Sequence, residues 1–164
     1  MEKEMKEVEF FLIYAKAIKD RVDNQPPNIS LFSSPKLDGM PHTNTVGNPT
    51  YKLAAKYIEL LERQEINKKM VALVEDFYNR LQEEKYKILL EARWNTVDKY
   101  RKLSPRERGR GRPSWRDYAT VKYCQIKDEE PPSYKTIDYW WREIVVMFYI
   151  FSKKNDFWEL KNKQ

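Results

Sequence analysis

The sequence contains very little cysteine and histidine, with Cys124 and His42 as the single representatives among 164 residues. One cysteine cannot form a disulfide within the chain, and a Cys/His zinc site needs several such ligands. This shortage favours an intracellular, cytoplasmic protein and predicts neither a metal nor a cofactor. It also argues against an enzyme, because we find no Ser/His/Asp set, phosphate-binding loop or metal-ligand spacing.

Glycine and long apolar runs are scarce as well. Only four glycines occur, while charged residues make up 34% of the chain and aromatic residues 14%. A chain this poor in glycine and rich in Lys, Glu, Leu and Arg favours an all-α fold over a sandwich or a barrel. The longest apolar run, Val145 to Phe151, is far shorter than the roughly 20 residues that span a bilayer, so no membrane partner is expected.

The amino-terminal part is predicted to begin with one amphipathic helix and a long connection. Apolar residues between Met5 and Val22 recur at steps of three and four, with Lys and Glu between them, which indicates a helix. Residues 24–48 contain four prolines and several Ser, Thr and Asn, and they show little apolar periodicity. We expect this segment to be a long connection.

A long helix is predicted to follow this connection. Asn48 can cap it, and Pro49 can occupy its first position, where the missing N–H costs nothing. Apolar residues keep helical spacing to about Leu81. A helix of this length packs on a partner helix or forms a dimer contact, so we expect a homo-oligomer. A further helix begins at Glu83 or Glu84, and its apolar face consists of Tyr86, Leu89, Leu90 and Trp94.

Positive charge is concentrated between residues 99 and 116. Eight Lys and Arg residues lie there against one acidic residue, Glu107, although the whole chain carries a net charge of only +6. A local basic patch is typical of nucleic-acid binders, because neutralising phosphates releases condensed counterions. Ser104-Pro105 and two glycines predict a mobile basic loop in this segment. The alternative is a solvated loop without a nucleic-acid role.

The segment from Gly111 to Phe151 is predicted to form a helix-turn-helix. A first helix opens at Ser114-Trp115, and the polar, proline-ended stretch from Gln125 to Pro132 terminates it. Ser133 can cap a second helix, an arrangement that lets such a helix enter the major groove of DNA. The core stripe of this second helix consists of Ile137, Trp140 or Trp141, Ile144, Val145, Phe148 and Phe151.

These features divide the chain into three parts. Residues 1–98 are expected to form a helical oligomerisation part, which includes the long connection at 24–48. Residues 99–113 form a basic loop, and residues 114–164 form a helix-turn-helix-like unit that binds double-stranded DNA.

Two groups of polar residues are expected to contact the DNA. On the second helix, one face opposite the core stripe would point into the groove, where Lys and Arg pair with guanine edges. That face could instead be merely solvated. The face consists of Tyr134, Lys135, Asp138, Tyr139 and Arg142, and the expected phosphate or minor-groove contacts are Arg106, Arg108, Arg110, Arg112 and Arg116.

Several stretches resemble a known family. NPTYKLAAKYIELLERQ and YKILLEARW, followed by SWRDYATV and SYKTIDYWWREIVVMF, resemble the layout of small phage late-gene transcription activators of the RinA and ArpU type. The resemblance implies a helical amino-terminal part and a helix-turn-helix similar to region 4 of sigma factors. It also implies that Ser133, Lys135 and Thr136 open the recognition helix and join the DNA-binding set. Arg93-Trp94 stands at the position of an Arg-Tyr pair of the family.

The expected function is a sequence-specific DNA-binding transcriptional regulator encoded by a phage or prophage, with RNA polymerase as a second partner. The chain departs from the family in two places. The basic segment from Lys99 to Pro113 is much longer than a usual turn, and Lys127 to Pro132 enlarges a connection in which about four residues are normal. The alternative function is a helical protein-interaction or packaging adaptor with a non-specific nucleic-acid contact.

Overall fold

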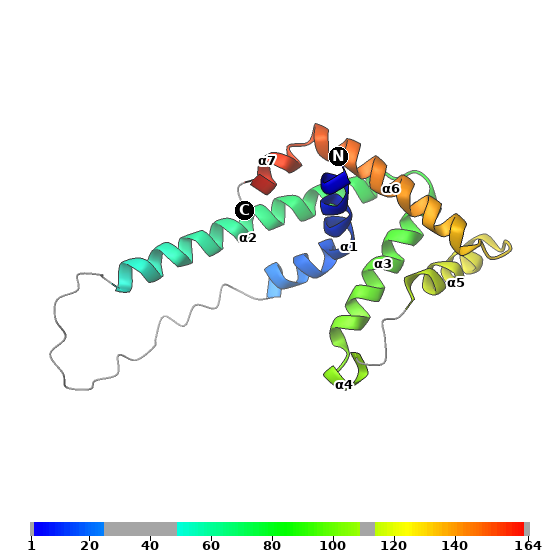
Figure 1. The fold of residues 1–164 in the computed structure, drawn as a ribbon, viewed down its shortest axis with the longest axis horizontal. Helices are drawn as coiled ribbons and strands as arrows, with labels where there is room; N and C mark the ends of the chain where they lie inside the picture. The colour runs from blue at the N-terminus through cyan, green and yellow to red at the C-terminus, as the bar shows by residue number, and fades with distance from the viewer. Residues whose placement is uncertain (1, 25–48, 109–113, 163–164) are drawn as a thin grey trace.

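A computed structural model describes residues 2–24, 49–108 and 114–162 of the chain. These residues form helices and contain no strand, which confirms the predicted all-α class (Figure 1). The helices are α1 (Glu2–Asn24), α2 (Pro49–Arg80), α3 (Glu84–Lys102), α4 (Pro105–Arg108), α5 (Trp115–Lys127), α6 (Tyr134–Lys154) and α7 (Phe157–Asn162).

The helix ends lie close to the predicted positions because local chemistry determines them. Pro49 is the first residue of α2, as the sequence indicated. Ser114 and Ser133 cap α5 and α6, and each hydroxyl accepts a hydrogen bond from a backbone N–H three residues later. Asp128 ends α5 in the left-handed region, with a φ of 51°. The expected long connection at 24–48 lies outside the described residues, apart from Asn24.

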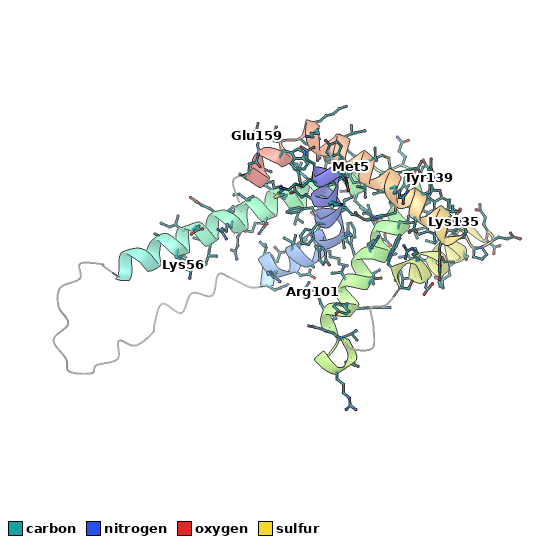
Figure 2. All side chains as sticks on the ribbon, in the orientation of Figure 1. Met5, Lys56, Arg101, Lys135, Tyr139 and Glu159 are labelled. Atoms are coloured by element: carbon teal, nitrogen blue, oxygen red, sulfur yellow. The ribbon has the colours of Figure 1, made fainter. Side chains whose placement is uncertain are left out.

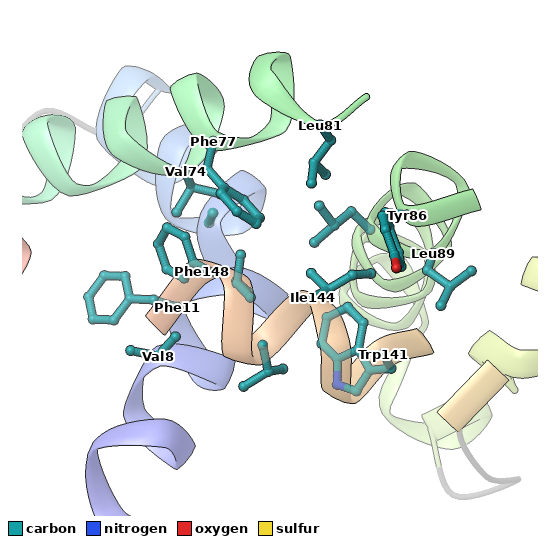
Figure 3. Close-up of a cluster of buried hydrophobic side chains, with 14 of the residues drawn as sticks. Val8, Phe11, Val74, Phe77, Leu81, Tyr86, Leu89, Trp141, Ile144 and Phe148 are labelled. Atoms are coloured by element: carbon teal, nitrogen blue, oxygen red, sulfur yellow. The ribbon is translucent and has the colours of Figure 1, made fainter. Parts of the chain in front are cut away.

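One hydrophobic core holds the helices together. Figure 3 shows Val8 and Phe11 from α1 beside Phe77 from α2 and Phe148 from α6. Phe157 of α7 closes this end of the core, and its ring centroid lies 5.3 Å from that of Phe11 and 5.8 Å from that of Phe148. The cluster also includes buried residues of α3 and α5. The two parts predicted on either side of residues 99–113 therefore share a single core.

The predicted basic loop is helical over most of its described length. Helix α3 continues to Lys102, and a short helix α4 follows at Pro105–Arg108. The backbone N–H of Ser104 donates to Glu107 Oε2 at 2.9 Å, and the Glu107 N–H donates back to Ser104 Oγ at 3.4 Å. This reciprocal capping box starts α4, with Pro105 as its first residue. The prediction of a loop was wrong for 99–102 and 105–108, while 109–113 lie outside the described residues.

Helix α2 extends well beyond the other helices at its amino-terminal end (Figure 1). Among the α2 side chains that the structure describes, residues 55–80, the buried ones begin at Met70 and lie in the second half of the helix. In the first half, Tyr57, Ile58 and Leu61 are exposed, with 56% of the Ile58 surface accessible. The first half of α2 therefore presents apolar side chains to solvent.

Candidate nucleic-acid interface

The outer face of α6 carries an exposed stripe of two cations and a tyrosine. Lys135, Tyr139 and Arg142 follow one another at steps of four and three, which places them on one side of a helix. All three are exposed, and Tyr139 has 62% of its surface accessible. Lys135 and Tyr139 lie on the side of α6 that faces away from the bundle (Figure 2). We call Lys135, Tyr139 and Arg142 the outer stripe.

Burial of the opposite side of α6 orients the outer stripe. Ile137, Ile144 and Phe148 have at most 1% of their surface exposed, and Trp141 has 4%. These residues occupy the side of the helix opposite the outer stripe, because each residue turns the helix by about 100°. Packing of this apolar side leaves the cations no orientation except toward solvent.

The hydroxyls of Ser133 and Thr136 form hydrogen bonds at the start of α6. Thr136 N–H donates to Ser133 Oγ at 3.2 Å, and the two side-chain hydroxyls share a hydrogen bond of 2.9 Å. Both residues belong to the set that the family resemblance assigned to DNA. In the structure their hydroxyls build the helix cap.

Two predicted DNA-contacting residues are paired with each other. Arg116 of α5 donates from Nε to Asp138 Oδ1 at 2.8 Å and from Nη2 to Asp138 Oδ2 at 3.1 Å. Hydrogen bonding to Asp138 raises the pKa of Arg116, so the guanidinium stays charged. In the same region, the Tyr134 hydroxyl donates to Asp117. Of the predicted groove-facing side chains, only those of the outer stripe form no hydrogen bond or ion pair with the described residues.

Helix α5 crosses beneath α6. Near the start of α5, the Trp115 ring lies 5.7 Å from the Trp141 ring, and near its end the Tyr123 ring lies 5.4 Å from the Trp140 ring. Trp115 and Tyr123 are roughly 12 Å apart along α5, yet they contact adjacent residues of α6. Because two helices that ran side by side would not give this pattern, the axes must cross.

The connection between α5 and α6 is longer than that of a standard helix-turn-helix. Residues 128–133 separate the two helices, whereas about four residues are usual. Within this connection, Glu129 accepts a hydrogen bond of 2.9 Å from the Tyr123 hydroxyl. Tyr123 packs on Trp140, which lies about 160° around the helix from Arg142. The Glu129 carboxylate is therefore held on a different side of α6 from the outer stripe.

Arg93 of α3 holds the start of α5 against α6. Its guanidinium lies 3.7 Å from the centroid of the Trp115 ring and 4.6 Å from that of the Trp141 ring. Trp141 Nε1 in turn donates to Glu9 Oε1 of α1 at 2.7 Å. Burial lowers the pKa of Arg93 to about 10. Helical periodicity could not predict these contacts, because the residues that form them are far apart in the sequence.

A second group of cations lies at the far end of α3. Arg106 is exposed, whereas Arg108 Nη2 donates to the Arg101 carbonyl at 2.7 Å. Helix α4, which carries Arg106 and Arg108, lies at the end of α3 away from α6 (Figure 1). The structure therefore does not bring these two arginines together with the outer stripe. Arg110 and Arg112 lie outside the described residues.

An open cleft of about 710 Å³ lies between α1, α2 and α3. Its charged groups are largely neutralised within the bundle. Lys19 and Glu75 form an ion pair across it at 2.5 Å. Glu91 accepts from the Tyr78 hydroxyl and from Lys122 Nζ, each at 2.6 Å. In the described ranges, no group of three His, Cys, Asp or Glu residues could hold a metal ion.

Comparisons with known proteins give no further assignment. No protein-family model, curated protein or solved structure matches this chain. The resemblance to phage late-gene activators therefore stays a prediction. Among the described residues, no helix is long and apolar enough to span a membrane.

Proposed function

We propose that this chain is a sequence-specific, double-stranded DNA-binding transcriptional regulator. The observation that carries the proposal is the outer stripe, in which Lys135, Tyr139 and Arg142 stand exposed on the first half of α6. A capped helix with its cations near its amino-terminal end is the element that many regulators insert into the major groove. The sequence resemblance adds that a phage or prophage encodes the protein.

The arrangement around α6 suits this role because it keeps the helix rigid. Packing between Arg93, Trp115 and Trp141 and the Arg116–Asp138 ion pair hold α5 and α6 together. A recognition helix must be held in this way, since mobile base-reading side chains lose geometric selectivity. The exposed Arg106 of α4 lies at the end of α3 away from α6, where it would supply a phosphate contact separate from the outer stripe.

Duplex binding across a salt series tests the proposal. We expect the wild-type chain to bind short duplexes with a steep salt dependence, and Lys135→Ala/Arg142→Ala to bind much more weakly at every salt concentration. Lys56→Ala/Lys69→Ala is the matched control, because it removes two exposed cations from the first 21 residues of α2. Absence of duplex binding at about 50 mM salt would overturn the proposal.

Two partners follow from this function. As a transcription activator, the protein would contact RNA polymerase, as the family resemblance implies. It would also act as a homo-oligomer, since paired reading helices bind two half-sites and the first half of α2 offers an apolar contact.

The exposed face of α2 favours one other function, that of a helical protein-interaction or packaging adaptor. Tyr57, Ile58 and Leu61 form an apolar patch at one end of the molecule. An adaptor would keep its protein contact through this patch and bind nucleic acid without base preference. Salt-sensitive binding that is equal for all duplex sequences would support the adaptor over the regulator.

A further inference from the structure

We propose that the outer stripe of α6 selects guanine, and that the Arg116–Asp138 ion pair creates this selectivity by removing a carboxylate from the base-reading face. The inference rests on the proposed function and specifies the DNA that it would recognise. Asp138 lies three residues after Lys135 and four before Arg142, so helical register places it at the edge of the same face.

The ion pair changes which hydrogen bonds this face can make. Both Asp138 oxygens accept from the fork of Arg116, at 2.8 Å and 3.1 Å. Lys135 and Arg142 only donate, and the Tyr139 hydroxyl can donate or accept. With its carboxylate engaged, the face offers mainly donors.

The bases differ in how many hydrogen bonds their major-groove edges can accept from a face of donors. Guanine presents two acceptors, N7 and O6, whereas adenine presents one acceptor and one donor. Cytosine presents a donor, which would need the carboxylate that Arg116 occupies. Thymine presents one acceptor, O4, beside its methyl group, so guanine is the base that offers each cation two acceptors.

The separation of the two cations gives the spacing of the guanines. Seven residues separate Lys135 from Arg142, which corresponds to roughly 10.5 Å along a helix that rises 1.5 Å per residue. Successive bases along one strand are about 3.4 Å apart. We therefore expect two guanines about three base steps apart, with Tyr139 facing the bases between them.

Arg116 contacts both Asp138 and the Trp115 ring, so its ion pair is part of the packing between α5 and α6. Its guanidinium lies 5.4 Å from the Trp115 ring centroid, and Trp115 packs against Trp141 and Arg93. Side chains of both members are 40% exposed, which leaves the pair at the surface where DNA would lie.

Selection from duplexes with a randomised centre, using the full chain, tests the inference. The wild type should enrich two guanines about three steps apart. Lys135→Ala and Arg142→Ala should each abolish the preference at one of these positions, with a loss of about 5- to 100-fold in affinity for the selected site.

Arg116→Ala is the decisive variant, because it frees the Asp138 carboxylate to accept from cytosine N4 or adenine N6. We expect it to enrich cytosine or adenine at a position where the wild type shows no such preference. Lys127→Ala is the matched control, since it also removes a cation that joins α5 to another helix, here through an ion pair of 3.2 Å with Glu84. This control should leave the selected sequence unchanged.

The outcomes separate the inference from the function on which it rests. Duplex binding without guanine enrichment, or an unchanged preference in Arg116→Ala, would overturn the inference and leave DNA binding in place. Absence of duplex binding at about 50 mM salt would overturn both.

Discussion

The guanidinium of Arg93 lies 3.7 Å from the centroid of the Trp115 ring and also faces Trp141, at 4.6 Å. A half-buried cation that contacts two indole rings joins α3 to both helices of the candidate interface. Cation–π contacts contribute about 1 to 2 kcal/mol each at a half-buried site, and they offset the cost of removing the charge from water. The stability of the α5–α6 junction therefore depends on Arg93.

We expect Arg93→Ala to lower the free energy of unfolding by about 3 kcal/mol, because it removes both ring contacts and leaves a cavity. Chemical denaturation followed by tryptophan fluorescence measures this change. Arg63→Ala is the control, since within the described part of the chain Arg63 forms only an exposed ion pair with Glu59, and the substitution should cost less than about 1 kcal/mol. Equal effects of the two substitutions would contradict the role assigned to Arg93.

A second prediction concerns Ser133, whose hydroxyl accepts from the Thr136 N–H at 3.2 Å. Ser133→Ala should destabilise the chain by about 1 kcal/mol, because the first turn of α6 loses its cap. Ser133→Asp should retain most of the stability, since aspartate is an equally good capping residue. Thermal unfolding of the three proteins checks this order. A Ser133→Asp variant as unstable as Ser133→Ala would show that the cap is unimportant.

Glu91 is expected to stabilise the bundle in a pH-dependent way. Its carboxylate accepts hydrogen bonds from Tyr78 of α2 and Lys122 of α5. Desolvation alone would raise the pKa of Glu91, but the hydrogen bonds from Lys122 and Tyr78 lower it below the ordinary value of 4.5. A depressed carboxyl pKa gives stability that is present above the unfolded-state pKa and is lost as the pH falls through the folded-state pKa.

The wild type should therefore be more stable than Glu91→Gln at pH 7, and the difference should shrink as the pH falls below about 4.5. Denaturation curves at several pH values measure both effects. Glu65→Gln serves as the control, because among the residues that the structure describes Glu65 pairs only with Lys68, on the same exposed helix surface. A difference between wild type and Glu91→Gln that stays constant from pH 7 to pH 3 would contradict this prediction.

Tyr78 should contribute stability that is lost as the pH rises into the alkaline range. Burial, together with the hydrogen bond to Glu91, raises the pKa of Tyr78 to about 12. The stability that this tyrosine contributes is complete below the unfolded-state pKa of about 10 and is lost as the pH rises toward 12. As the pH rises from about 10 to about 12, the free energy of unfolding of the wild type should therefore fall relative to that of Tyr78→Phe. Ultraviolet titration should show one late-ionising tyrosine fewer in the variant, and loss of a tyrosine that ionises near pH 10 instead would refute the assignment.

The helices could be predicted from sequence because neighbouring residues determine them. Ser114, Ser133 and Pro49 lie at helix starts in both the prediction and the structure. The wrong prediction at 105–108 has a local cause as well. Ser104-Pro105 was interpreted as a break, whereas Glu107 three residues after Ser104 completes a capping box and starts a helix.

The interactions that build the candidate interface could not be predicted in the same way. Arg116 and Asp138 are 22 residues apart, and Trp141 and Glu9 are 132 apart. Their contacts depend on how α1, α5 and α6 pack, which helical periodicity does not specify. Sequence reasoning therefore identified the polar face of α6, but it could not separate the free cations Lys135 and Arg142 from the paired Arg116.

The exposed patch on the first half of α2 leads to the last prediction. Ile58 and Leu61 are 56% and 39% exposed, and burying such side chains in a contact with a second copy would be favourable by about 25 cal/mol for each Å² of apolar surface. Sedimentation velocity should show self-association of the wild type, and Ile58→Glu/Leu61→Glu should sediment as a monomer with unchanged helix content. Val121→Glu replaces a similarly exposed residue of α5, 57% accessible, and should not alter the association. A wild type that is monomeric at all concentrations would show that the patch does not bind a second copy.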